Sequence, residues 1–331
     1  MMHSAEPRKP PRRVEPRHAG RPRPWAIVLA GGQGVRLRTL TRHLHGDDRP
    51  KQYAALRGTR SLLRETLDRV ALLVPADRTV IVTTQQHLPY TAMEVDLAVP
   101  GPWVLVQPAD RGTAAGVLWP AHWIHARDAA ATVAVFPSDH LVLEEEAFMS
   151  HVGRIAGFVD ARSVWTVLLG ALPTDAETGY GWVEPAERIG WAEGSPVHRV
   201  RRFVEKPGVE TARVLYASGA LWNTFVFVTR AAVLVEAGRE RLPDVDERLR
   251  RAAAFDPAEH RRWALRQAYA LMPKANFSRS VLEAWPSELG VSKLPPRITW
   301  CDLGTPERVV RALAGLGARP PWVDTWLAGV R

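Results

Sequence analysis

The stretch WAIVLAGGQGVRL, residues 25–37, joins an apolar run to a glycine-rich turn. The run WAIVLA at 25–30 has the length and the aliphatic content of a buried strand. Gly31, Gly32 and Gly34 follow it, and because they lack Cβ atoms, backbone N–H groups can approach a phosphate or a base edge. Ligands of open α/β sheets bind here, just beyond the carboxyl end of a strand. The stretch therefore predicts a first strand that leads into a ligand-binding loop.

This loop differs from both common nucleotide-binding fingerprints. A Walker loop needs GxxxxGK followed by Ser or Thr, and the dinucleotide pattern needs GxGxxG, whereas Arg36 and Leu37 stand where each would need another residue. Alone, the loop could be a tight strand-to-loop turn. The segment DRPKQY at 48–53 adds Lys51 as a second cation after Arg36, and two cations beside a glycine-rich loop suit a polyphosphate. A solvated basic loop is the alternative.

Short apolar runs alternate with helical patterns along the rest of the chain, as is typical of a mostly parallel sheet covered by helices. Further strands are expected at 80–83, 103–106, 132–136, 164–169, 180–185, 197–205, 222–229 and 298–301. Helices are expected at 61–73, 113–125, 144–159, 209–218, 231–239, 258–272 and 305–314. Ser61 and Thr113 are expected to cap the helices that they begin. The predicted fold class is α/β, with a Rossmann-like mixed, mostly parallel sheet flanked by helices.

Composition narrows the class of protein. The chain has 331 residues, 46% hydrophobic and 24% charged, which is typical of a globular protein. Its longest apolar stretches fall far short of the ~20 residues of a membrane span, and no signal-peptide core follows the basic N-terminus, so we expect a cytoplasmic protein. Cys301, the single cysteine, excludes an intrachain disulfide and a multi-thiolate zinc site and leaves any metal to oxygen ligands.

The basic excess is concentrated at the N-terminus. Residues 1–24 hold seven basic and two acidic residues, which supply +5 of the net charge of +9, together with six prolines. We expect this segment to be a disordered Pro/Arg-rich tail whose role stays open. No obvious linker follows it, so residues 25–331 are predicted to form a single catalytic domain. That body has no basic stripe interleaved with aromatic residues, so specific nucleic-acid binding is not expected.

More motifs follow the glycine-rich loop in order. They are QPADRGTAAG (107–116), FPSDH (136–140), TGYGWVE (178–184), FVEKP (203–207), LWNTFVF (221–227) and WCDLGTPERV (300–309). With the GGxGxRL and PKQ strings, they make residues 25–315 resemble the sugar-1-phosphate nucleotidyltransferases. The PKQ and FPSDH strings, together with QPxxxGTA at 107–114, favour the mannose-1-phosphate guanylyltransferase branch. The resemblance implies a GT-A-like fold and Mg²⁺-dependent transfer from GTP to mannose 1-phosphate, giving GDP-mannose and pyrophosphate.

The resemblance also assigns site residues, motif by motif. It implies Arg36, Lys51 and Lys206 as catalytic residues. The nucleotide would be bound by Gly31, Gly32, Gly34, Gln107, Gly112 and Thr113. The sugar phosphate would be bound by Gly181, Glu205, Lys206 and Asn223.

Two aspartates are candidates for holding Mg²⁺. Asp139 comes just past the end of a predicted buried strand, so its carboxylate would face the ligand crevice as a hard oxygen ligand. Asp302 directly follows the short strand that ends at Cys301. Either one alone could be a helix-cap or turn carboxylate, and the resemblance implies that they act as a metal-holding pair.

Several alternatives stay open. Another sugar-1-phosphate nucleotidyltransferase would use glucose 1-phosphate with UTP or dTTP. A catalytically silent nucleotide-sugar-binding regulator would be expected to lose Arg36, Lys51 or an aspartate, and all are present. A glycosyltransferase of related architecture would show a DxD motif, which PSDH does not supply. The segment 273–285 departs from the family pattern, so the sugar epimer stays open, as do strictness for GTP and the oligomeric state, with a homodimer among the options.

Overall fold

The computed structural model describes residues 23–96, 101–162, 165–255 and 258–329. The predicted N-terminal tail therefore lies, up to residue 22, outside the described residues. That residues 25–331 form a single domain stays a prediction.

A nine-stranded sheet runs through the molecule in the order β3-β2-β1-β4-β9-β6-β10-β8-β7. Four adjacent strands at one end of it are parallel throughout: β1 (Trp25–Leu29), β2 (Thr79–Thr84), β3 (Trp103–Gln107) and β4 (Thr132–Pro137). Their carboxyl ends meet at one edge, so the glycine-rich loop after β1, Gln107 at the end of β3 and Asp139 after β4 share that edge.

The other half of the sheet mixes directions. Its strands are β6 (Thr166–Ala171), β7 (Gly181–Ala192), β8 (Ser195–Glu205), β9 (Leu221–Arg230) and β10 (Leu289–Lys293). Strand β9 lies antiparallel between β4 and β6, β10 is parallel to β6, and β7 and β8 form an antiparallel pair. An extra β7–β9 pairing closes β9, β6, β10, β8 and β7 into a ring. The predicted α/β fold, with a mixed, mostly parallel sheet flanked by helices, is confirmed.

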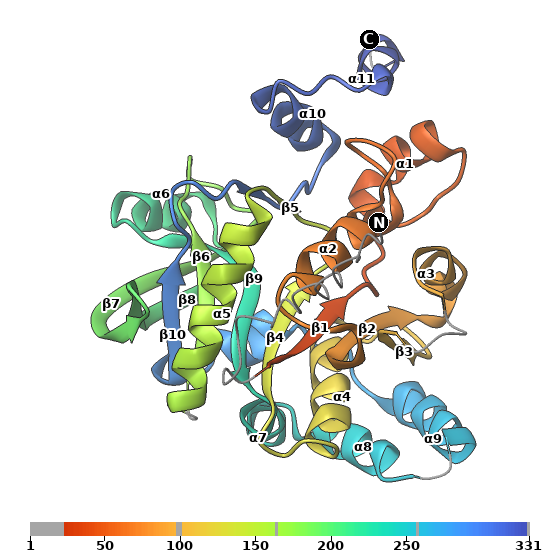
Figure 1. Cartoon of the computed structure of the whole chain (residues 1–331), viewed down its shortest axis with the longest axis vertical. Coiled ribbons are helices and arrows are strands. Elements are labelled where there is room, and N and C mark those ends of the chain that lie inside the picture. The colour runs from red at the N-terminus through yellow and green to blue at the C-terminus, as the bar shows by residue number, and fades with distance from the viewer. Residues whose placement is uncertain (1–22, 97–100, 163–164, 256–257, 330–331) are drawn as a thin grey trace, which may run out of the picture.

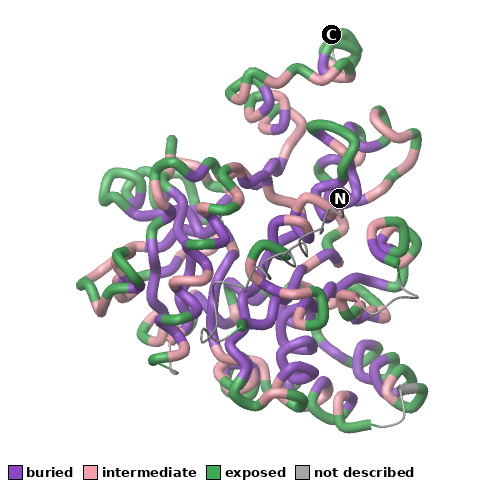
Figure 2. The backbone as a smooth tube through the Cα atoms, in the orientation of Figure 1, coloured by how far each residue is buried: buried purple, intermediate pink, exposed green. Residues whose placement is uncertain are grey.

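Helices cover both faces of the sheet (Figure 1). The alternation of strand side chains sends Ile27 into one core and its neighbours Ala26 and Val28 into another. The first core packs on α4 (Thr113–His125), α7 (Ala231–Arg241), α8 (Pro243–Ala253) and α9 (Ala258–Leu271). The second packs on α2 (Leu62–Ala71), α5 (Glu145–Ala161) and α6 (Val209–Ala217). Figure 2 shows the buried strands between these layers.

A third apolar cluster joins the C-terminal helices to the loop region. It brings α10 (Pro306–Gly315) and α11 (Pro321–Gly329) against α1 (Arg38–His45), at the top of Figure 1. Nearby, β5 (Leu141–Val142) and β11 (Trp300–Cys301) form a separate two-stranded sheet. The short helix α3 (Leu88–Glu94) follows β2.

The structure corrects several local expectations. Ser61 caps α2 as predicted, because its hydroxyl accepts from the Arg64 N–H at 3.0 Å. Thr113 does not cap α4, since its Oγ1 accepts from the Phe277 N–H at 2.8 Å and Gly112 holds the cap position. Strand β10 was not predicted, nor were α1, α3, α8 and α11. The segment LGVSK is too short to signal a strand by itself, and β6 and β8 on either side make it one.

Candidate active site

The glycine-rich loop and the PKQ segment form one packed unit. Gly34 has φ +58°, and a Cβ there would lie 2.7 Å from the Lys51 backbone nitrogen, so the position requires glycine. The Gln52 amide nitrogen donates to the carbonyl oxygens of Ala30 at 2.8 Å and Gly32 at 2.9 Å. These hydrogen bonds fix the start of the loop next to Lys51, although the two segments lie about 20 residues apart in sequence.

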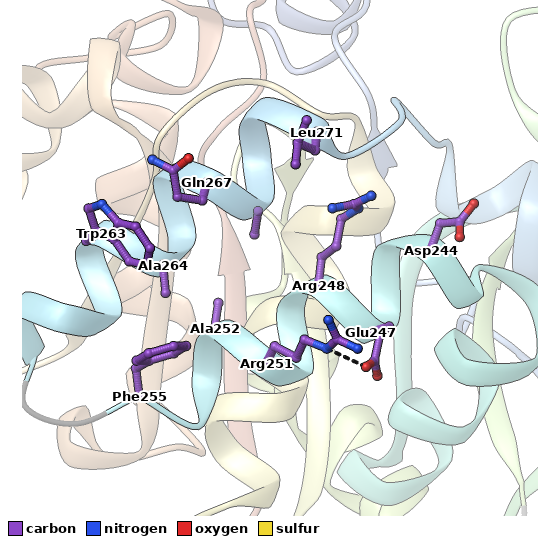
Figure 3. Close-up of a pocket in the computed structure, with 11 residues that line it drawn as sticks. Asp244, Glu247, Arg248, Arg251, Ala252, Phe255, Trp263, Ala264, Gln267 and Leu271 are labelled. Atoms are coloured by element: carbon purple, nitrogen blue, oxygen red, sulfur yellow. Dashed lines mark hydrogen bonds and ion pairs between the residues drawn. The ribbon is translucent and has the colours of Figure 1, made fainter.

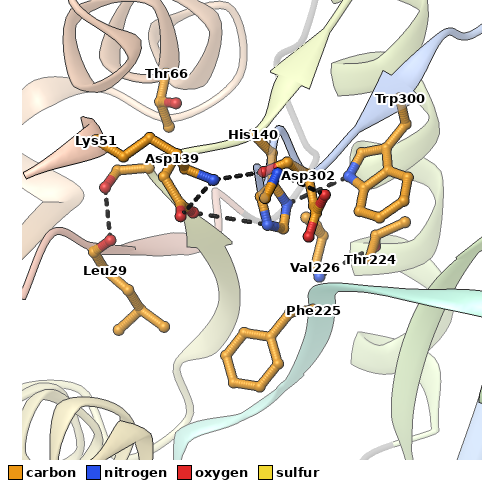
Figure 4. A network of polar contacts seen from close by, with 12 residues as sticks. Leu29, Lys51, Thr66, Asp139, His140, Thr224, Phe225, Val226, Trp300 and Asp302 are labelled. Atoms are coloured by element: carbon orange, nitrogen blue, oxygen red, sulfur yellow. Dashed lines mark hydrogen bonds and ion pairs between the residues drawn. The ribbon is translucent and has the colours of Figure 1, made fainter. Parts of the chain in front are cut away.

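Lys51 lies at the centre of a polar network (Figure 4). Its side chain is 6% exposed, and its Nζ lies 2.9 Å from Asp139 Oδ2. The same ammonium donates to the backbone carbonyl of Asp302. Burial acts to raise the pKa of the Asp139 carboxyl, but the positive charge of Lys51 and the hydrogen bond from its ammonium outweigh burial and hold that pKa below its usual range. Asp139 is thus an ionised carboxylate, one-third exposed.

Asp302 meets this network from the small β5–β11 sheet and not from the main sheet. Its Oδ1 accepts from the Tyr180 hydroxyl at 2.9 Å, the Gly304 N–H at 2.9 Å and the Arg308 guanidinium at 3.3 Å. Arg308 also pairs with Glu177. The two predicted metal ligands are therefore brought to the same ammonium, Asp139 through its carboxylate and Asp302 through its carbonyl.

The His140 imidazole is neutral and lies next to the Asp139 carboxylate. Its Nδ1 accepts from the Trp300 indole N–H at 3.3 Å, and because an indole only donates, the ring proton is assigned to Nε2. That Nε2 lies 3.6 Å from Asp139 Oδ1. Burial lowers the pKa of His140, and the neighbouring Asp139 charge only partly opposes it. The ring therefore supports Asp139 and is not a strong base.

A pocket of about 440 Å³ opens beside this network. It is lined by Leu29, Gly31, Gly32, Val82, Gln107, Asp110, Gly112, Thr113, Gly116, Lys274, Ala275 and Asn276. The structure thus gathers every predicted nucleotide-binding residue except Gly34 around one cavity. Such a volume is within the range of small-molecule sites.

The wall of the pocket is formed by two segments far apart in sequence. Gly112 has φ +82°, and a Cβ there would lie 2.2 Å from the Ala275 carbonyl oxygen. Ala275 in turn accepts from the Ala114 N–H at 3.2 Å, which fixes the start of α4. Asp110 and Lys274 form an ion pair at 2.9 Å on the rim.

The predicted sugar-phosphate residues meet on the other side of the network. A Cβ on Gly181 would lie 2.9 Å from Glu205 Oε2 and 3.3 Å from the Asn223 Cβ, so these three residues are packed together. Burial raises the pKa of Glu205, against the opposing charge of Lys206. The Lys206 N–H donates to the Tyr180 carbonyl at 3.2 Å, and the Lys206 side chain is 53% exposed. Tyr180 therefore links this group to Asp302.

Comparison with known proteins agrees with this arrangement. The family model described as Nucleotidyl transferase matches residues 25–318. The chain belongs to the nucleotidyl transferase family. Apart from Gly34 and Arg36, the predicted site residues of this family member thus lie at the pocket, in the charged network or in the group around Glu205.

Individual relatives narrow the resemblance. The mannose-1-phosphate guanylyltransferase of Escherichia coli K12 is 28% identical over 286 residues, which is 85% of this chain and 58% of the relative. That of Salmonella montevideo is 32% identical over 222 residues, 66% of this chain and 45% of the relative. The chain spans about half the length of these curated relatives.

Solved structures share the fold. The crystal structure of a mannose-1-phosphate geranyltransferase from Thermus thermophilus is 30% identical, with a TM-score of 0.74 over 90% of this chain and 80% of that one. A mannose-6-phosphate isomerase from Helicobacter pylori has a TM-score of 0.64 at 20% identity, over 84% of this chain and 99% of that one, and supports the fold alone. No helix in the described part of the chain combines the length and apolar character needed to cross a membrane.

Asp139 and Asp302 supply oxygen atoms, the donor type that hard divalent cations take. Within the described residues, no group of three or more His, Cys, Asp or Glu side chains could hold a metal by themselves. Mg²⁺ is bound in phosphoryl-transfer sites by one or two carboxylates, with substrate phosphates and water completing its shell. The ionised, partly exposed Asp139 carboxylate fits this chemistry, whereas the Asp302 carboxylate is held by Tyr180, Gly304 and Arg308.

Arg36 is the predicted site residue that the structure leaves apart from the others. Arg36 is exposed on the turn Val35–Leu37 and makes no ion pair with the described residues, so it lies on the loop and does not contact the network.

The sequence did not indicate Gln52, Tyr180 and Tyr269 as site residues. Gln52 and Tyr180 lie inside quoted motifs, which is a signal that could have found them, whereas Tyr269 lies in no motif.

A second hollow lies apart from the motif residues, between α8 and α9 (Figure 3). Its lining mixes acidic, basic and apolar side chains, among them Asp244, Arg248, Phe255 and Trp263. None of the predicted site residues lines it, so the candidate active site is the pocket lined by Gly31, Gln107 and Gly112.

Proposed function

We propose that the protein transfers a guanylyl group from GTP to mannose 1-phosphate, releasing GDP-mannose and pyrophosphate. The observation that carries this proposal is the Lys51–Asp139–Asp302 network, which is linked to the nucleotide pocket through Gln52 and to the Glu205 group through Tyr180. A donor and an acceptor bound on these two sides would meet at the network. The choice of GTP and mannose 1-phosphate rests on the names of the relatives.

The reaction needs positioning and charge neutralisation more than proton transfer. A phosphate oxygen of the sugar phosphate attacks the α-phosphorus of the nucleotide, the bond to the β-phosphate oxygen breaks, and pyrophosphate leaves with that electron pair. A phosphomonoester has its second pKa near ~6, so the nucleophile is already an anion at neutral pH. No general base is required, which agrees with a neutral His140 held in a structural role.

Cations of this chain would bring the two anions together. Arg36 and Lys51 hold the triphosphate and stabilise the charge that moves onto pyrophosphate. Lys206, exposed beside the partly buried Glu205, holds the attacking phosphate, while Glu205, Gly181 and Asn223 contact the sugar. Without ligand, the Lys51 ammonium is paired with Asp139. When the nucleotide binds, the same ammonium would contact both Asp139 and the triphosphate.

Asp139 and Asp302 would hold Mg²⁺. When bound, the ion would supply positive charge to the phosphates of the nucleotide.

Pyrophosphate release by the purified protein tests this function. GTP, ATP, UTP and dTTP are each combined with mannose, glucose and N-acetylglucosamine 1-phosphates, with Mg²⁺ and with excess chelator. We expect the greatest release with GTP and mannose 1-phosphate, and none with chelator. Preference for glucose 1-phosphate with UTP or dTTP would reassign the substrates. No release from folded protein that binds nucleotide would favour a silent regulator.

A further inference from the structure

Gln107 is an almost fully buried polar side chain that faces the nucleotide pocket. It is 5% exposed and lines the cavity at the end of β3. A Cβ on Gly31 would lie 2.9 Å from its Nε2, so a larger residue at this position would displace the amide. Among the described residues, Nε2 has no hydrogen-bond partner. This amide nitrogen therefore has unused hydrogen-bonding capacity in a residue that lines the pocket.

The other end of the amide is held from behind by α9. The Tyr269 hydroxyl donates to Gln107 Oε1 at 3.1 Å, and Tyr269 is 1% exposed. Its backbone carbonyl accepts from Arg111 Nε at 2.6 Å, and its ring packs edge-on against Trp119 at 6.5 Å between centroids. Both the backbone and the ring of Tyr269 are thus fixed.

Hydrogen-bond satisfaction decides which way the amide points. Burial raises the pKa of the Tyr269 phenol, so the hydroxyl keeps its proton and needs an acceptor. Among the described residues, the Tyr269 hydroxyl has Gln107 Oε1 as its acceptor. If the amide turned over, Nε2 would face the hydroxyl and the phenolic proton would be left unpaired in the core, which is unfavourable. The oxygen therefore faces Tyr269 and the NH₂ group faces the pocket.

We propose that Tyr269 is a positioning residue that orients the Gln107 amide, so that the pocket presents an N–H donor and selects a base with a carbonyl oxygen over adenine. Guanine offers its O6 acceptor to such a donor, whereas adenine offers an amino group at the same position. If adenine bound, its amino group would face the Gln107 amide N–H, and these donors could not pair with each other. A site with such a mismatch discriminates strongly against the wrong base. This inference rests on the proposed function, in that the pocket holds the base of the nucleotide.

The Tyr269→Phe variant tests the orientation while keeping the ring. Without the hydroxyl, the amide is free to turn and can accept from adenine. We expect the ratio of GTP to ATP affinity, measured by titration calorimetry, to fall about tenfold. Tyr216→Phe, which removes an exposed hydroxyl far from Gln107 in sequence, is the matched control and should keep the wild-type ratio.

A second variant separates orientation from general loosening of α9. In Gln107→Glu both side-chain oxygens are acceptors, so the wild-type donor is absent and the GTP preference should be lost. Adding Tyr269→Phe to that variant should not change the ratio further, because no amide remains to turn. Equal weakening of GTP and ATP by Tyr269→Phe would overturn the proposal, as would a ratio that shifts equally in both backgrounds.

The binding measurement also distinguishes this inference from the proposed function. Pyrophosphate release with an unchanged base ratio in Tyr269→Phe would leave the guanylyltransferase standing and refute the role of Tyr269. A ratio that falls in a protein without turnover would support the role of Tyr269 and refute the reaction. A wild-type protein that binds neither nucleotide would overturn both.

Discussion

Replacing Lys51 with methionine tests the ion pair at the centre of the site. The Lys51 ammonium is nearly buried, whereas the Asp139 carboxylate at 2.9 Å is 37% exposed. Exposed pairs contribute about 0.2–1 kcal/mol, and breaking a fully buried pair costs about 3–5 kcal/mol. With one partner buried and one partly solvated, we expect Lys51→Met to lower the free energy of unfolding by about 2 kcal/mol. For a chain of this size, that corresponds to a fall in Tm of about 3 °C.

The loss of stability caused by Lys51→Met should depend on pH in a definite direction. The pKa of Asp139 is held below its usual range in the folded protein, so the pair stabilises the fold above the ordinary carboxyl pKa, and this contribution is lost as pH falls through the folded pKa. In Lys51→Met, burial is no longer opposed by the ammonium and the pKa of Asp139 rises. The penalty should therefore be largest near pH 7 and should shrink below about pH 4, where Asp139 is protonated in the variant.

Urea denaturation in the presence of chelator measures this without any dependence on activity. The free energy of unfolding is compared for the wild type, Lys51→Met, Asp139→Asn and the double variant, which together form a thermodynamic cycle. We expect a coupling energy above about 1 kcal/mol at pH 7. A coupling below about 0.3 kcal/mol, or a penalty for Lys51→Met that is the same at pH 7 and pH 4, would refute the reasoning.

Three further predictions use other parts of the molecule. Gly112→Ala places a Cβ 2.2 Å from a backbone oxygen at φ +82°, so it should destabilise by more than about 2 kcal/mol and weaken nucleotide binding, whereas Gly58→Ala, in open space, should be neutral in the same melts. Burial, helped by a neighbouring guanidinium, lowers the pKa of His151 to about 4, so stability should be lost as pH falls from about 6.5 towards 4, and urea melts of His151→Gln should show a flatter dependence. Arg36→Ala should leave Tm within about 1 °C, because the side chain is exposed, yet lower pyrophosphate release at least about 100-fold. Arg60→Ala, an exposed arginine paired away from the site, should keep full turnover in that assay, and equal turnover in both would contradict a role for Arg36.

The sequence determined the parts of the site that lie within single strand-to-loop connections. The run at 25–30 and the glycines after it predict a strand and its loop, because hydrophobicity and the need for missing Cβ atoms are local properties. Asp139 is placed by the same reasoning, since two residues past a buried strand must lie at the carboxyl edge of a parallel sheet. The order of the motifs was enough to indicate the family.

Tertiary structure decided what depends on distant contacts. Strand β10 exists because β6 and β8 flank it, and Asp302 reaches Lys51 from a separate small sheet that no local pattern announces. Tyr269 carries no motif, and its significance comes from a hydrogen bond to a residue 162 positions away. Hydrophobic periodicity and loop chemistry act over a few residues, so the sequence predicts them. The pairing of buried polar groups depends on which surfaces meet when the chain packs, and only the folded molecule specifies it.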